Sequence, residues 1–213
     1  FLSSPADLGL DATGYDLPPF EVRTHVIDDD MENLPADRDG QFKLLRDTAT
    51  SLSEAAREKS SSILARVAKA KELIDEASPD EHFILWHDLE AERHAIKKAI
   101  PEAVDIYGSM DYDERERRVI DFQEGKTRIF ATKKSLSGCG CNFQKYCHRA
   151  IFVGIDYEFN DFIQAIHRIH RFLQTEKVII DIIYTQAEEE IWEALRELSL
   201  IHISEPTRPR LIS

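Results

Sequence analysis

Residues 164–171 read QAIHRIHR, and the interpretation of the whole chain starts from this stretch. On one α-helix, at about 100° per residue, Gln164, Arg168 and Arg171 lie within about 60° of each other. The opposite side of that helix collects apolar side chains, namely Phe159, Phe162, Ile166, Ile169 and Leu173. The sequence therefore predicts a helix that docks through its apolar side. It would present a glutamine and two guanidinium groups, which suit phosphate, away from the core.

Short apolar runs alternate with helical segments around this stretch, from residue 80 to residue 195. The predicted strands are 83–86, 104–107, 128–131, 150–153 and 178–184, and the other predicted helices are 89–99, 112–123 and 187–195. Strands that alternate with helices predict an α/β fold, with a parallel sheet, helices on both faces and right-handed crossovers. Ligands on such a sheet gather at the carboxyl ends of the strands, where we expect the segments discussed below.

The balance of charge argues at first against nucleic acid, since 40 acidic residues face 27 basic ones and the net charge is −13. The excess of acid lies mainly in the first 80 residues, however. Residues 123–149 hold one acid, Glu124, and six bases: Lys126, Arg128, Lys133, Lys134, Lys145 and Arg149. This basic strip could bind a phosphate backbone, or its members could be ordinary surface residues. No run of 18 apolar residues occurs, so no membrane span is predicted.

A glycine-bearing segment, residues 132–144, follows the third predicted strand. Gly138 and Gly140 would let the backbone approach a phosphate closely. Hydroxyl groups and positive charge come just before them, from Thr132, Lys133, Lys134 and Ser135. A Gly-x-Gly loop by itself is weak evidence for any one ligand.

Together these segments resemble the second RecA-like lobe of superfamily 2 helicases, in the form seen in Swi/Snf-type DNA translocases. Residues 164–174 look like motif VI of that family, and residues 132–144 look like motif V. Residues 83–88 look like its motif IV strand. Residues 107–125 look like the block that follows the family's second strand. The motifs occur in the family's order between residues 80 and 195, and helicase-like proteins of phages and prophages look especially similar. One departure is Phe172-Leu173, where the family usually has Ile-Gly or Phe-Gly.

The resemblance implies a RecA-like α/β fold and an ATP-dependent helicase or translocase. It implies that Arg168 and Arg171 are catalytic arginine fingers and that Gln164, Gly138 and Gly140 bind nucleotide. Contacts with nucleic acid are implied for Thr132, Lys133, Lys134, Asn142 and Ser109. The implied cofactors are ATP and Mg²⁺, both held mainly by a first RecA-like lobe, and the implied partners are that lobe and DNA, with RNA as the alternative. We expect no membrane partner, and action in the cytoplasm of a bacterial or phage-infected cell.

Three other patterns are set aside. Gly125-Lys126-Thr127 looks like the end of a phosphate loop, but Ile120 stands where the first glycine belongs and the pattern follows a helix. The acidic 80–82 segment precedes its strand, so it does not match a magnesium-binding motif. Zinc is disfavoured because Cys139, Cys141, Cys147 and His148 lack paired ligand spacing, and no metal ligand is predicted. The odd number of cysteines argues for a reducing compartment.

The chain divides into four predicted parts. Residues 1–40 are interpreted as the end of a preceding lobe and a connector, in which 21–27 could form a short strand. Residues 41–78 are predicted to be helical and residues 79–197 to form the RecA-like lobe. Residues 198–213 look like a translated sequencing adapter, because Pro206 and Pro209 forbid a continued helix. The absence of a phosphate loop predicts half of an ATPase site, and a non-catalytic binding module is the alternative function.

Overall fold

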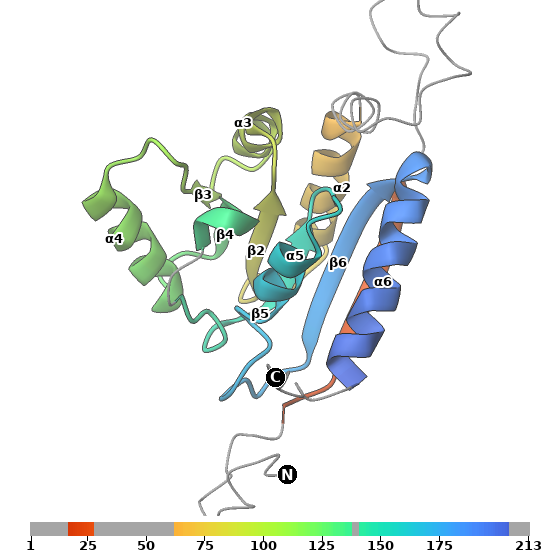
Figure 1. Ribbon diagram of the computed structural model, residues 1–213. Helices are drawn as coiled ribbons and strands as arrows, with labels where there is room; N and C mark the ends of the chain where they lie inside the picture. Colours follow the sequence, from red (N-terminus) through yellow and green to blue (C-terminus); the bar gives the residue numbers. More distant parts are fainter. Residues whose placement is uncertain (1–16, 28–61, 138–140, 205–213) are drawn as a thin grey trace, which may run out of the picture.

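The computed structural model of the protein describes residues 17–27, 62–137 and 141–204, which contain a six-stranded sheet (Figure 1). The strand order is β1-β6-β5-β2-β4-β3, and every pairing is parallel. The strands are β1 (Phe20–Ile27), β2 (His82–His87), β3 (Val104–Asp105), β4 (Ile129–Lys133), β5 (Cys147–Phe152) and β6 (Val178–Thr185). All carboxyl ends therefore lie at one edge of the sheet and all amino ends at the other.

Helices cover both faces of this sheet, which confirms the predicted RecA-like α/β architecture. They are α2 (Ile63–Asp75), α3 (Glu90–Ala99), α4 (Tyr112–Gln123), α5 (Phe159–Ile166) and α6 (Glu189–Ser204). Helices α2 and α3 contribute to one apolar cluster, and α4, α5 and α6 to another on the opposite face. Figure 1 accordingly shows α5 in front of the sheet and α2 behind it.

Strand β2 illustrates why short apolar runs become central strands. Phe83, Ile84, Leu85 and Trp86 are each at most 1% exposed. Phe83 and Leu85 join the cluster under α2 and α3, whereas Ile84 and Trp86 join the cluster on the other face. A strand that is covered on both faces needs a continuous apolar run, which is the pattern that the sequence shows.

The edge strand β1 confirms the short strand that the sequence suggested at 21–27. In the structure it pairs in parallel with β6 along its full length, from Phe20 opposite Val178 to Ile27 opposite Thr185. A buried carboxylate, Asp181, adds a side-chain link, because its Oδ1 lies 2.8 Å from His25 Nε2. The weak alternation of this strand is explained by its position, since an edge strand is only partly covered.

The predictions for the two ends of the chain are tested only where the structure describes them. Of the helical segment predicted at 41–78, the structure describes α2, and residues 28–61 lie outside the described part. The closing helix was expected to stop near residue 195, but the backbone of α6 continues to Ser204. Residues 198–204 contain no proline or glycine, so the restriction that Pro206 imposes acts only beyond them. None of the helices described is long and apolar enough to cross a bilayer.

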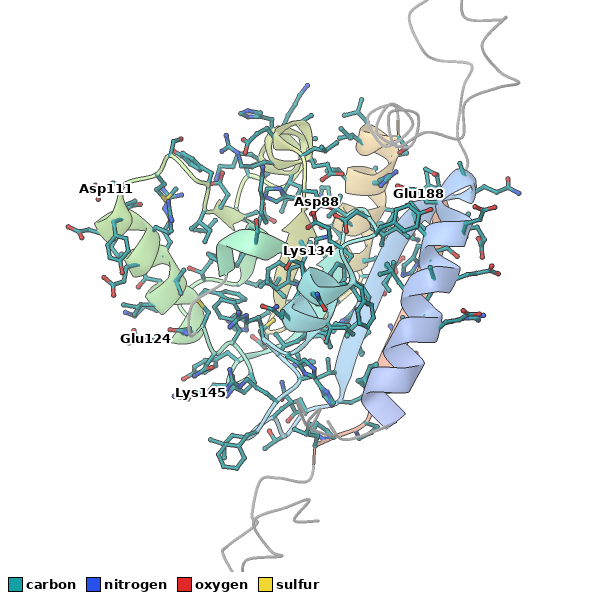
Figure 2. The ribbon with its side chains drawn as sticks, viewed as in Figure 1. Asp88, Asp111, Glu124, Lys134, Lys145 and Glu188 are labelled. Atoms are coloured by element: carbon teal, nitrogen blue, oxygen red, sulfur yellow. The ribbon has the colours of Figure 1, made fainter. Side chains whose placement is uncertain are left out.

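A buried ion pair connects the helix α2 to the turn η5 (Gln186–Glu188) after β6. Arg66 Nη2 lies 2.8 Å from Glu188 Oε2, and the two side chains are 0% and 2% exposed. The same carboxylate oxygen accepts a hydrogen bond of 2.9 Å from the backbone N–H of Thr185. Figure 2 shows Glu188 at the carboxyl edge of the sheet, where α2 begins.

Removing one partner of this pair should leave an uncompensated buried charge. We expect Glu188→Ala to lower the free energy of unfolding by about 3–5 kcal/mol, as measured by urea denaturation. The double variant Arg66→Met/Glu188→Leu should recover most of that loss, because both charges are then absent. A single variant as stable as the wild type would contradict the importance of the pair.

A second buried polar group is His87, at the carboxyl end of β2. It is 1% exposed, and neither ring nitrogen has a hydrogen-bond partner among the residues that the structure describes. Burial lowers the pKa of His87 below its usual value of 6.5, against the opposing influence of the Glu92 and Asp88 carboxylates. The imidazole is therefore neutral at neutral pH.

This shift predicts a pH-dependent stability. Because the folded-state pKa is the lower one, the unfolded chain takes up the proton first as the pH falls below 6.5. The contribution of neutral His87 to the free energy of unfolding is thus complete above pH 6.5, and it is lost as the pH falls towards the folded-state pKa. We expect His87→Leu to lose less stability than the wild type between about pH 7.5 and about pH 5.5 in denaturant titrations. His94→Leu, which changes an exposed histidine, should behave like the wild type, and equal losses for all three proteins would refute the interpretation.

Candidate functional site

The predicted arginine helix ends earlier than the sequence pattern indicated. Helix α5 stops at Ile166, so Arg168 and Arg171 lie in the turns after it, and the prediction of one helix over 164–171 was wrong. After Ile166 the backbone tightens, because the N–H groups of Arg168 and Ile169 donate to the carbonyls of Ala165 and Ile166, three residues back and not four. The carbonyl of Arg168 accepts a hydrogen bond of 3.1 Å from the N–H of Phe143, and the carbonyl of Ile169 accepts one of 3.0 Å from Gln174 Nε2. We therefore name residues 167–174 the arginine turn.

The end of the arginine turn is held by the buried amide of Gln174. Its Nε2 donates to the carbonyl oxygens of Cys147 and Ile169, and its Oε1 accepts from the N–H groups of Thr175 and Glu176. The residue before it, Leu173, has a φ of 70°, in the left-handed region that favours glycine. The turn that glycine usually forms in the resembling family is thus made here by leucine, with 58% of that residue exposed.

The turn and α5 bring three of the predicted site residues, Gln164, Arg168 and Arg171, together at one pocket. Its volume is about 370 Å³, and it is lined by Leu17, Gln164, His167, Arg168, His170 and Arg171. Gln164, Arg168 and Arg171 thus meet as predicted, although they do so through a turn and not along one helix. The sequence did not single out the other three residues as site residues, and no local signal could have linked Leu17 to this pocket.

The two arginines in this pocket are not neutralised by the described residues. Neither guanidinium forms an ion pair within the described part of the chain, and Arg168 Nε is buried without a hydrogen-bond partner. Arg171 Nη1 donates to Oδ1 of Asn142, a neutral acceptor. In a protein with 40 acidic residues, a pair of uncompensated guanidinium groups forms a local anion-attracting site.

This arginine pocket lies at the amino edge of the sheet. The arginine turn contacts the start of β5 through Cys147 and the residues before β1 through Pro18. The expectation that all the singled-out segments lie at the carboxyl ends was therefore wrong for this one. Because α5 runs antiparallel to the strands, its end and the following turn return to the amino edge. The segment 132–144 spans both edges, and its last residues, Asn142 and Phe143, meet the arginine turn.

At the carboxyl edge, Lys134 is occupied by an internal ion-pair network. Its Nζ lies 2.7 Å from Asp156 Oδ2 and 3.2 Å from Asp88 Oδ1, and its side chain is 4% exposed. Figure 2 shows Lys134 close to Asp88, with both far from Lys145. Thr132 is 0% exposed, and its hydroxyl donates to the carbonyl of Lys133. Both side chains are thus buried in this structure, and their predicted contact with nucleic acid stays a prediction.

The remaining predicted contacts are divided between the two edges. Lys133 is half-buried at the carboxyl edge, 3.4 Å from Glu90 Oε1, and Ser109 is exposed in the loop after β3. Asn142 is exposed at the amino edge beside Arg171. Gly138 and Gly140 lie outside the described residues. The structure thus brings the residues of the arginine pocket together, whereas the residues predicted to contact nucleic acid lie at two opposite edges of the sheet.

The basic strip is less available than its composition suggested. Most of its bases bond to carboxylates or backbone carbonyls of the same lobe, namely Lys126, Arg128, Lys133, Lys134 and Arg149. Lys145 differs, because its Nζ lies 4.9 Å from the ring centroid of Tyr146 and has no carboxylate partner within the described residues. Cys141 and Cys147 are buried, with no disulfide in the described part of the chain, and burial raises the pKa of Cys147 to about 12. Within the described ranges no cluster of histidine, cysteine and acidic residues could hold a metal ion.

The left-handed conformation of Leu173 predicts a stabilising substitution. A side chain in this region costs about 1–2 kcal/mol, whereas glycine loses about 0.5–1 kcal/mol more in chain entropy on folding. We expect Leu173→Gly to raise the free energy of unfolding by up to about 1 kcal/mol in urea titrations. Leu173→Ala should bring no such gain, because alanine keeps the Cβ. A glycine variant less stable than the alanine variant would show that the turn is not strained.

Comparisons with known proteins agree with this architecture. The family model described as "Helicase conserved C-terminal domain" matches residues 66–173. Among solved structures, the C-terminal part of the Fun30 ATPase domain is similar, with a TM-score of 0.54 and 22% identity over 60% of this chain and 44% of that one. The C-terminal domain of the DEAD-box protein Dbp5 is also similar, with a TM-score of 0.53 and 16% identity over 63% of this chain and 78% of that one. These two likenesses establish the fold, and no curated protein matched the chain.

The chain spans less than half of the Fun30 structure that it resembles, so this likeness concerns the fold alone. The family match covers α3, α4 and α5 with the four strands β2–β5, and it includes both pocket arginines. Since this match covers just over half of the residues, the protein belongs to the helicase conserved C-terminal domain family.

Proposed function

We propose that the chain is the second motor lobe of an ATP-dependent DNA helicase or translocase of the Swi/Snf type. One observation carries the proposal: two guanidinium groups that have no carboxylate partner among the described residues share a pocket with Gln164. Membership of the helicase C-terminal family supports it. The resemblance of the sequence to phage and prophage helicase-like proteins would place its action in the cytoplasm of a bacterial or phage-infected cell.

In this proposal Arg168 and Arg171 act on a nucleotide that the first RecA-like lobe carries. Phosphoryl transfer depends mainly on positioning and on stabilising the charge that develops on the γ-phosphate. ATP and Mg²⁺ supply the reacting phosphate and the metal charge when they are bound to the first lobe. Gln164 lines the same pocket and can bond to the nucleotide, while Asn142 orients the guanidinium of Arg171.

Nucleic-acid contacts are proposed for the exposed residues of the two edges. At the carboxyl edge Lys133 and Ser109 would contact the phosphate backbone. Lys134 and Thr132 would support that edge from within, because both are buried. The segment 132–144 runs from this edge to the arginine turn and would couple nucleic acid to the nucleotide. Gly138 and Gly140 are proposed to allow close approach of a phosphate, and RNA is an alternative substrate to DNA.

The proposal is tested by ATP hydrolysis in the full-length protein in which this lobe follows its first lobe. We expect Arg171→Ala and Arg168→Ala each to lower the rate of hydrolysis by about 10³-fold or more, with ATP binding almost unchanged, because a finger acts mainly in the transition state. Arg117→Ala, which removes an exposed arginine of α4, is the matched control and should keep the wild-type rate.

The results separate this function from its rival. The alternative is a non-catalytic RecA-like module that binds nucleic acid or a protein partner. A full-length protein that binds DNA but hydrolyses no ATP would support the module. Wild-type hydrolysis by Arg171→Ala and Arg168→Ala would exclude the finger role.

A further inference from the structure

The residues that lead into β1 form one wall of the arginine pocket. Leu17 lines this pocket together with Arg168 and Arg171. Residues 17–27 lie outside the stretch that matches the helicase family. The pocket is therefore completed by a part of the chain that is remote in sequence from its arginines, and its shape depends on how the two parts are joined.

The side chain of His170 joins them. Its Nε2 lies 3.0 Å from the carbonyl oxygen of Pro18, and since a carbonyl only accepts, Nε2 carries the proton. Its ring also packs on Phe20, with the ring centroids 5.1 Å apart and the planes inclined by 50°. His170 is half-buried, so these contacts are partly shielded from water. One side chain thus touches the segment before β1 twice.

Strand β1 is a firm anchor for this contact. All eight of its residues are in register with β6. The fully buried Asp181 of β6 bonds at once to His25 of β1, at 2.8 Å, and to Arg149 of β5, at 3.2 Å. The carbonyl of Pro18 therefore stands at the start of a strand that is fixed to the centre of the sheet.

The arginine turn needs such an anchor because it lies beyond the last residue of α5, to which the N–H of His170 still donates at the carbonyl of Ile166. The N–H of Phe143 donates a hydrogen bond to the carbonyl of Arg168, and the N–H of Gln174 donates one to the carbonyl of Arg171. His170 stands between these two points, next to Arg171 in the chain. We propose that His170 is a positioning residue, which ties the arginine turn to the start of β1 and so keeps Arg168 and Arg171 aimed into the pocket. This inference rests on the proposed function, since it concerns the aim of the proposed fingers.

The test measures kcat and KM for nucleic-acid-stimulated ATP hydrolysis by the full-length protein. His170→Phe keeps a ring beside Phe20 but removes the donor. We expect its kcat to fall by about tenfold or more, towards the roughly 10²-fold cost of a misplacement of about 1 Å, at an unchanged KM and melting temperature. His170→Gln, which keeps an amide donor, should restore most of kcat. The control His94→Ala, an exposed histidine of α3, should match the wild type.

Two results would overturn the proposal. One is a kcat for His170→Phe within about twofold of the wild type. The other is an equal loss in His170→Phe and His170→Gln that follows a fall in melting temperature, which marks a purely structural role. Arg171→Ala in the same assay distinguishes the two levels of inference. If Arg171→Ala keeps the wild-type rate, the finger role of Arg171 is refuted together with the positioning role of His170. If Arg171→Ala loses the rate but His170→Phe does not, only the positioning role of His170 is refuted.

Discussion

The buried amide of Gln174 is the interaction on which the arrangement of the site depends. An unpaired amide in a protein interior is costly, so its two donors and its acceptor must find partners. They find them in Cys147 at the start of β5, in Ile169 inside the turn, and in the two N–H groups that follow Gln174. Gln174 thereby links the beginning of the strand β5 to the residues between the two arginines. The sheet thus supports the charged turn directly.

The two edges of the sheet treat positive charge in opposite ways. At the carboxyl edge Lys134 is surrounded by carboxylates that come from the ends of β2 and β5, so its charge stabilises the lobe itself. At the amino edge the guanidinium groups of Arg168 and Arg171 have no such partners among the described residues. Basic residues that are equally prominent in the sequence therefore serve different ends: Lys134 is neutralised within the lobe, whereas Arg168 and Arg171 keep charge for an outside anion.

Much of the fold could be predicted from the sequence because its signals are local. Helix α4 has the predicted bounds, since Asp111 accepts hydrogen bonds from the N–H groups of Asp113 and Glu114, and Gly125 takes the left-handed conformation after its end. The grouping of Gln164, Arg168 and Arg171 was also predicted. The end of α5 was not, because apolar residues recur at helical spacing through Leu173. Beyond that end the carbonyls of Arg168 and Ile169 accept hydrogen bonds from Phe143 and Gln174, and periodicity carries no information about such partners.

The edge position of β1 has a practical meaning for anyone who prepares shortened forms of this protein. A version that starts at residue 66, where the family match begins, would remove β1 and leave β6 at the border of the sheet. Strand β1 carries the exposed Arg23, which forms an ion pair with Glu21. Charged side chains on an edge strand discourage the strands of other molecules from pairing with it. Strand β6 reads VIIDIIYT, and its single carboxylate would lose the partner His25. Such a trimmed lobe would expose a long apolar ladder and self-associate, so soluble preparations should keep the chain from before Leu17.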